Sequence, residues 1–401
     1  MGRVLRFAHS LRRFKQFVAT PERRLLLIAL AARLIPAALI YGTDDVQAWE
    51  TWGRMLAGGG NPYASKYLIA WPPLWLPVVW LSFVTADATG IPFYFIAKLF
   101  PIAADIILMF LLYAEAGYGT ALAYAVNPVS IYTSSIHGNF DPIPALCLTA
   151  AVVRMRGKGV WLGIGAAFKT WPLLMLAAVI APLKTLRMRA RVALTAIGIF
   201  FGALLLALPF GSGAVIEVLK YRGGIHWWGI SSISFLFGGR LPASIFLWTF
   251  YLAMGAASLL LLVRRTPALH GALFMLLTLY VTAPAFGLQY LIWIVPIALL
   301  VDRRRALIYT LLATALIAWE LLVRPYTGHI GEMVRILPHL GYARAYGHHT
   351  DQLYTVIGRL FPWVFCCYWW MAAGRALLAG SRWSGRSSSD ASGSSAPPSA
   401  A

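Results

Sequence analysis

The chain contains little charge. Only 12% of its 401 residues are Asp, Glu, Lys or Arg, which is about half the fraction found in a soluble domain. Because 60% of the residues are hydrophobic, a soluble globular protein is excluded. Disorder is excluded for most of the chain as well, since 16 Trp, 18 Tyr and 21 Phe cannot stay solvated. The composition therefore predicts an integral, multi-pass protein whose main partner is the lipid bilayer.

Cysteine and acidic residues are also scarce. The three cysteines lie in apolar segments and form neither a CxxC pair nor a His/Cys zinc spacing, so no disulfide framework or metal site is indicated. The 34 basic residues outnumber 14 acidic ones, which gives a formal net charge of +20. They form short clusters between apolar runs, not the continuous basic face that nucleic acid requires. No nucleic-acid partner is expected, and the clusters are typical of the positive-inside rule of membrane proteins.

The apolar runs predict the fold class and the domain organisation. We expect an all-α polytopic membrane protein with about 10–12 transmembrane helices, some short or re-entrant, because a full span needs about 20 residues. A basic cytoplasmic N-terminus (residues 1–24) precedes a single transmembrane domain (25–375), and a Ser-rich cytoplasmic tail (376–401) is expected to be disordered. The runs are residues 25–41, 73–86, 92–114, 120–135, 141–153, 159–183, 192–210, 241–263, 267–283, 287–301, 306–323 and 352–373. The three longest loops, predicted to be non-cytoplasmic, are residues 42–72, 211–240 and 324–351.

Residues 120–183 allow two topologies. If every apolar run there crosses the membrane, the basic residues at 154–158 face outward and residues 137–141 face inward, against the positive-inside rule. If two of the runs are re-entrant, the basic residues stay inside and residues 137–141 join the outer face. The break at Lys169-Thr170-Trp171-Pro172 slightly favours the re-entrant version, because proline interrupts a helix. Broken helices at membrane depth are tolerated only where they are buried in protein or line a cavity.

The loop after the first apolar run begins with two adjacent acids, Asp44 and Asp45. In the stretch that follows, Trp49 and Trp52 share one helical face, which predicts an amphipathic helix along the membrane interface. The two acids can cap that helix, or they can do chemistry at the membrane surface. They also offer oxygen ligands to a divalent cation, so cation dependence stays open and no metal ligand is assigned.

Two basic residues interrupt apolar runs. Arg33 is expected either to snorkel or to pack against a partner. Lys169 lies beside a proline, and a charge there is a candidate anion ligand. Its alternative is an ion pair with Asp105 or Asp141.

The second outer loop adds Arg222 and His226 as candidate ligands of a phosphate. Trp227 and Trp228 follow them and are able to stack on a sugar ring. We favour the simpler interpretation that these two tryptophans anchor the loop at the membrane interface.

Four short elements follow one another along residues 25–300. They are, in order, Asp45-x6-Trp52 with Asn61-Pro62-Tyr63 and Trp71-Pro72-Pro73-Leu74; His137-Gly138-Asn139-Phe140-Asp141; the Gly-rich segment from Gly163 to Pro172; and Gln289-Tyr290-Leu291 with Trp293 and Pro296. Together they resemble the elements of the GT-C glycosyltransferases, membrane enzymes that use sugars linked to a polyprenyl phosphate. The family's second element is His-Gly-Gln-Phe/Tyr-Asp, and its first has a tyrosine where this chain has Trp71.

The resemblance implies a GT-C fold whose first outer loop bears interfacial helices. It implies an inverting glycosyltransferase that moves a hexose, with mannose as a candidate, from a polyprenyl-phosphate sugar to a lipid-linked glycan, glycolipid or cell-envelope acceptor. Asp45 matches the family's acid and becomes the expected catalytic base, with Asp44 as its competitor. The expected donor-binding residues are Lys169, His137, Asp141, Arg222, His226, Gln289 and Tyr290. His137 and Asp141 have a second interpretation, as structural partners at the tip of a hairpin.

The chemistry agrees with one carboxylate on the outer face. A polyprenyl phosphate is a good leaving group, so the reaction needs one base for the acceptor and cationic groups around the phosphate, without the paired acids of a glycosidase or a further cofactor. The alternative is a lipid or solute transporter or flippase without glycosyl transfer, which predicts ionisable residues near mid-membrane on several helices. Compact loops and the absence of a soluble domain favour a prokaryotic plasma membrane, with the site on its non-cytoplasmic side.

Overall fold

The computed structural model describes residues 20–65, 67, 69, 71–154, 156–211, 213, 215–216, 218, 228–236, 241–322 and 348–380. Across these residues the protein is all-α, with helices joined by short 3-10 or π-helical turns and no strand. Three of the described helices are long and apolar enough to cross a membrane: Phe93–Ala125, Leu186–Phe210 and Ala243–Arg264. The all-α class is therefore confirmed for this part of the chain, while the number of spans and the side of each loop stay predictions.

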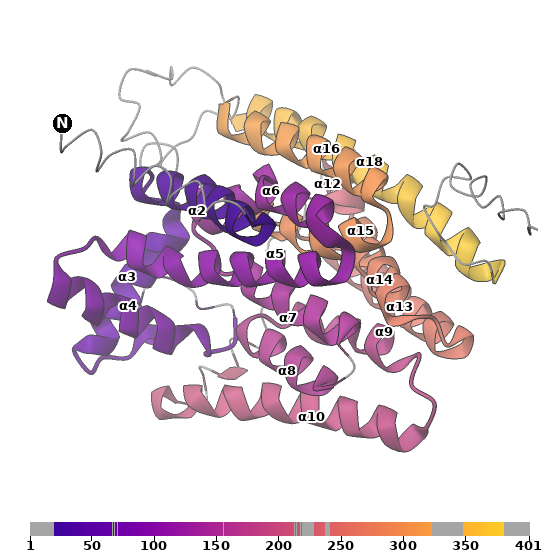
Figure 1. Ribbon diagram of the computed structural model, residues 1–401, viewed down its shortest axis with the longest axis horizontal. Helices are drawn as coiled ribbons and strands as arrows, with labels where there is room; N and C mark the ends of the chain where they lie inside the picture. The colour runs from indigo at the N-terminus through magenta and orange to yellow at the C-terminus, as the bar shows by residue number, and fades with distance from the viewer. Residues whose placement is uncertain are drawn as a thin grey trace, which may run out of the picture.

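The N-terminal helices form one end of the molecule. Helix α2 (Pro21–Leu39) begins after Thr20, whose hydroxyl accepts a hydrogen bond from the Arg23 amide at 3.4 Å, and α2 packs along α5 (Phe93–Ala125). The next two helices, α3 (Asp44–Ala57) and α4 (Trp75–Thr89), pack against each other at the left of Figure 1, and the short 3-10 helix η1 (Pro62–Ala64) lies between them in sequence.

Helix α5 joins two of the predicted apolar runs. Gly117 interrupts it with φ 77° and ψ −177°, so the long part before this residue and the short part after it are separate helical segments. Helix α6 (Pro128–Ile131) and the π-helical turn η2 (Tyr132–His137) follow, and η2 ends at Gly138 in the left-handed region. This irregular path brings residues 137–141 back to the start of α3, and such π-helical turns are frequent at functional sites.

Helices α7 (Pro142–Val153) and α8 (Lys158–Phe168) form a hairpin whose open end carries Asp141 and Lys169. With 12 and 11 residues, each is too short to span a bilayer alone. The predicted break is confirmed, because Lys169 is extended and a 3-10 turn, η3 (Trp171–Met175), precedes α9 (Leu176–Ile180). Which of the two predicted topologies this hairpin follows in a membrane stays a prediction.

The Gly-rich segment has a packing role. Figure 1 shows α8 between α7 and α10 (Leu186–Leu204), which continues as η4 (Leu205–Phe210). A Cβ at Gly163 would lie 2.8 Å from the Cβ of Ile199 and 2.9 Å from the carbonyl oxygen of Ala196. Only glycine therefore lets α8 approach α10 this closely.

The C-terminal half surrounds α14 (Ala268–Thr282), which packs against α9, α13 (Ala243–Arg264), α15 (Val295–Val301) and α18 (His348–Leu378). Helix α12 (Gly229–Leu236) comes just before α13 in the chain and packs against α14, and α16 (Arg303–Leu322) lies beside α18. The predicted run 287–301 is not one helix, because η5 (Leu288–Ile292) is a 3-10 turn that ends before α15.

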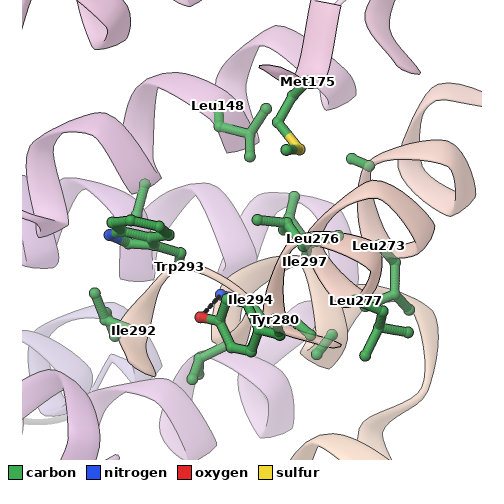
Figure 2. Packing of buried hydrophobic residues seen from close by; sticks show 14 of the residues in the cluster. Leu148, Met175, Leu273, Leu276, Leu277, Tyr280, Ile292, Trp293, Ile294 and Ile297 are labelled. Atoms are coloured by element: carbon green, nitrogen blue, oxygen red, sulfur yellow. Dashed lines mark hydrogen bonds between the residues drawn. The ribbon is translucent and has the colours of Figure 1, made fainter. Parts of the chain in front are cut away.

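Figure 2 shows the apolar core that joins this half to the hairpin. Leu148 and Met175 approach Leu276 and Ile297, and Trp293 lies at the edge of the cluster. Within it, the Ile294 amide donates a hydrogen bond of 3.3 Å to the Tyr280 hydroxyl, which itself donates to the Tyr290 carbonyl at 2.5 Å. Tyr280 therefore fixes the irregular segment that carries Tyr290 and Trp293.

Candidate functional site

The start of α3 presents Asp45. This side chain is half-buried in the first turn of the helix, where the helix dipole favours a negative charge. Its Oδ2 accepts a hydrogen bond of 2.8 Å from Nδ2 of Asn139. The preceding Thr43 places its hydroxyl 3.3 Å from Nδ1 of His137 and donates to the His137 carbonyl at 3.4 Å. The start of α3 and the segment 137–139 therefore hold each other in place.

His137 is buried, and three charges act on it. Burial is the main cause that lowers the pKa of His137, and the positive charges of Lys169 and Lys98 lower it further. The negative charge of Asp45 opposes them and raises the pKa. This lowered pKa favours the neutral imidazole form of His137.

Asp141 and Lys169 form the centre of the site. Nζ of Lys169 lies 2.8 Å from Oδ2 of Asp141, and the Trp293 indole donates to Oδ1 at 2.5 Å. Of the two partners predicted for Lys169, the structure selects Asp141. Both Asp141 oxygens are engaged, so this carboxylate positions a cation and an indole.

Aromatic rings enclose the Lys169 ammonium. It lies 4.5 Å from the Tyr290 ring centroid, 5.3 Å from that of Phe140 and 5.7 Å from that of Trp293. Trp293 stacks between Trp171, at 4.4 Å, and Tyr290, at 4.2 Å. The break in the hairpin thus places its lysine beside the rings of Tyr290, Trp293 and Phe140, which stabilise a cation.

Phe140 connects this stack to α3 and α4. The centroid of its ring lies 4.9 Å from the ring centroid of Trp75, 5.6 Å from that of Trp71 and 5.8 Å from that of Trp49. Trp49 and Trp52 are fully buried, so they pack within the protein and do not face lipid, while the position of their helix at a membrane interface stays a prediction. The helix itself is present as predicted.

Five of the predicted site residues come together, although they are far apart in sequence: Asp45, His137, Asp141, Lys169 and Tyr290. Gln289 is half-buried and folds back against Gly287, where an added Cβ would lie 2.7 Å from its Cδ; no hydrogen bond ties it to this cluster within the described residues. Arg222 and His226 lie outside the described residues, as does the side chain of Asp44.

The tryptophan that follows this undescribed segment corrects another prediction. Trp228 is 1% exposed, its indole donates to the Tyr280 carbonyl at 2.6 Å, and its ring stacks on Phe286 at 4.1 Å. It is therefore a buried structural residue, neither an interfacial anchor nor a platform for sugar.

Sequence reasoning passed over the roles of Thr43, Asn139 and Lys98. Asn139 lies inside the second element, but no local pattern connects it to Asp45. Lys98 is fully buried, and its ammonium donates to the Ile40 carbonyl at 2.5 Å. Its chain lies under Gly138, where a Cβ would be 2.8 Å from the Lys98 Cε, and Gly138 also has φ 78°. The segment 137–141 therefore needs glycine at this position.

Within the described part of the chain, no group of three or more His, Cys, Asp or Glu side chains is arranged to hold a metal ion. A scan against protein-family models finds no match, and a search among curated proteins finds no matching sequence.

Proposed function

We propose that the protein is a membrane-embedded, inverting glycosyltransferase of the GT-C type that takes a hexose from a polyprenyl phosphate. The observation that carries this proposal is the convergence of the four elements that resemble the family. Asp45 contacts Asn139 of the second element, and Asp141 at the end of that element contacts Lys169 of the third and Trp293 of the fourth. Chance matches along a sequence would have no reason to meet in space.

Asp45 is suited to be the catalytic base. One of its oxygens is held by Asn139, and no described residue is hydrogen-bonded to the other, Oδ1. The acceptor hydroxyl attacks the anomeric carbon, and its proton passes to Oδ1 of Asp45. The bond from that carbon to the phosphate oxygen breaks, and its electron pair leaves with the polyprenyl phosphate. Attack opposite the leaving group inverts the anomeric centre, so a β-linked donor gives an α-linked product.

Lys169 is suited to hold the departing phosphate. An ammonium group has three donors, and Asp141 takes one of them, which leaves two for the phosphate oxygens. Its side chain is 12% exposed, so it is accessible without being fully hydrated. Electrostatic stabilisation of a leaving group is strongest where donors are held in place beforehand, as Asp141 and the rings hold Lys169 here.

The test uses purified protein with polyprenyl-phosphate-linked, radiolabelled hexoses and measures the release of polyprenyl phosphate and the anomeric configuration of the product. We expect Asp45→Asn to lower kcat about a hundred- to ten-thousand-fold, the usual contribution of a general base. Asp87→Asn is the matched control, because Asp87 is an exposed acid on the neighbouring helix α4. Equal kcat in the Asp45→Asn variant and the wild type would contradict the proposal.

The same assay separates the proposal from a transporter. In liposomes, a flippase would move the labelled lipid between leaflets with its glycosyl–phosphate bond intact. Several ionisable residues that a transporter would need are already paired in the structure: Arg33 with Asp105 at 2.9 Å and Glu320 with Arg359 at 2.7 Å. The pairing supports a scaffold role for these charges.

A further inference from the structure

Asn139 leaves one polar atom without a partner beside the proposed base. The side chain is 2% exposed, and its Nδ2 is the atom that faces Asp45, so the orientation of the amide is fixed. The backbone is fixed as well, because the Asn139 amide donates to the Thr133 carbonyl at 2.8 Å. The remaining atom, Oδ1, is buried and accepts no hydrogen bond from any described residue. A buried acceptor left unpaired is costly, and a folded protein rarely keeps one without a reason.

Asp45, the hydrogen-bond partner of Asn139, is half-buried and also has an oxygen that no described residue occupies. This oxygen is Oδ1, and the two side chains are joined by a hydrogen bond of 2.8 Å. Two acceptors on adjacent, mutually fixed groups match two donors on adjacent atoms of a ligand. Neighbouring hydroxyls of a sugar ring provide such a pair.

We propose that Asn139 Oδ1 accepts a hydrogen bond from a second hydroxyl of the acceptor sugar, adjacent to the hydroxyl whose proton Asp45 removes. The enzyme then selects acceptors that carry two neighbouring free hydroxyls at the site of transfer. This inference rests on the proposed glycosyltransferase function and makes Asn139 a specificity-determining residue.

The experiment is a double-mutant cycle in which residue 139 of the enzyme and one hydroxyl of the acceptor are changed separately and together. A short-chain polyprenyl-phosphate hexose serves as donor and octyl glycosides of mannose, glucose and galactose as acceptors, and product analysis identifies the hydroxyl that is glycosylated. Analogues of the best acceptor that lack or methylate each neighbouring hydroxyl are then assayed with the wild type, Asn139→Ala and Asn139→Gln. Melting temperatures in detergent show whether each variant is folded.

For the wild type, we expect removal or methylation of one neighbouring hydroxyl to lower kcat/KM about tenfold or more, as for a buried hydrogen bond left unmade. In Asn139→Ala the same change should have no further effect, because the partner is already absent. Asn139→Gln keeps the amide one methylene further out and should recover part of the discrimination.

The outcomes separate the two proposals. Equal losses for the deoxy acceptor in the wild type and in Asn139→Ala would overturn the role of Asn139 while leaving the glycosyltransferase intact. Absence of any cleavage of the donor by the wild type, with acceptor or with water, would overturn the proposed function and this inference with it.

Discussion

Two groups of buried charges in this protein are built differently. The first pairs Arg33 of α2 with Asp105 of α5 at 2.9 Å, and both side chains are fully buried. Tyr124 and Ser130 donate to the two Asp105 oxygens at 2.5 and 2.6 Å, while Arg33 also donates to the Ala125 carbonyl at 2.8 Å. Every oxygen of the acid is occupied, and the group ties α2, α5 and α6 together.

The second group, around Asp45 and Lys169, is open. Lys169 is 12% exposed, Asn139 Oδ1 is unpaired, and the Trp171 indole has no acceptor among the described residues. A saturated buried network rigidifies a scaffold, whereas unused donors and acceptors in a half-buried cluster are typical of a binding site. The closed group around Asp105 is therefore expected to act on stability, and the open group around Asp45 and Lys169 on activity.

The largest expected effect comes from breaking the closed group, which is the Arg33–Asp105 pair with Tyr124 and Ser130. Arg33→Met leaves Asp105 as an uncompensated buried charge, and we expect a loss of about 3–5 kcal/mol in stability. Thermal unfolding in detergent measures it. Arg54→Met is the control, because the Arg54 side chain is 71% exposed in its pair with Glu50 and such pairs contribute little. Similar melting temperatures for the two variants would show that the first group is not a scaffold.

Removing the charge of the open group should act on donor binding more than on stability. Lys169→Gln keeps a donor for Asp141 but loses the ammonium, and we expect kcat/KM for the donor to fall about ten- to a hundredfold, the contribution of one hydrogen bond between charged groups. Lys184→Gln, which changes an exposed cation, is the control. A large fall in melting temperature with unchanged kinetics would place Lys169 in the scaffold instead.

The smallest effect concerns His137. Its pKa is lowered in the folded state, so between that pKa and about 6.5 the unfolded chain binds more protons, and the folded state loses stability as the pH falls. We expect the melting temperature of the wild type to drop more between pH 7.5 and 5.5 than that of His137→Gln. Groups that titrate in both proteins cancel in this difference. Identical pH profiles would show that His137 is not held neutral by the fold.

The candidate site was predictable in part. Local features indicate Asp45, as one of two adjacent acids, and Lys169, as a charge beside a proline, while His137, Asp141 and Tyr290 are implied by the family resemblance. Their convergence was not predictable from those features, because it depends on contacts across 94 residues for Asp45 with Asn139 and 28 for Lys169 with Asp141. The burial of Trp49 and Trp228 inside the protein was not predictable for the same reason, since an aromatic residue near a membrane surface has the same local pattern whether it meets lipid or protein.

The sequence by itself determined the all-α class and the helix break beside Pro172, whereas the break before α15 was not predicted. Hydrophobic composition requires burial of long apolar helices, and Pro172 and Gly138 act through local backbone geometry that needs no distant partner. Only the tertiary structure decided which charges meet. Asp105 and Asp141 are both acids in apolar surroundings, and Lys169 was an equal candidate for either. Helix packing places Arg33 beside Asp105 and Lys169 beside Asp141, and each buried acid therefore pairs with the basic residue that lies within contact distance.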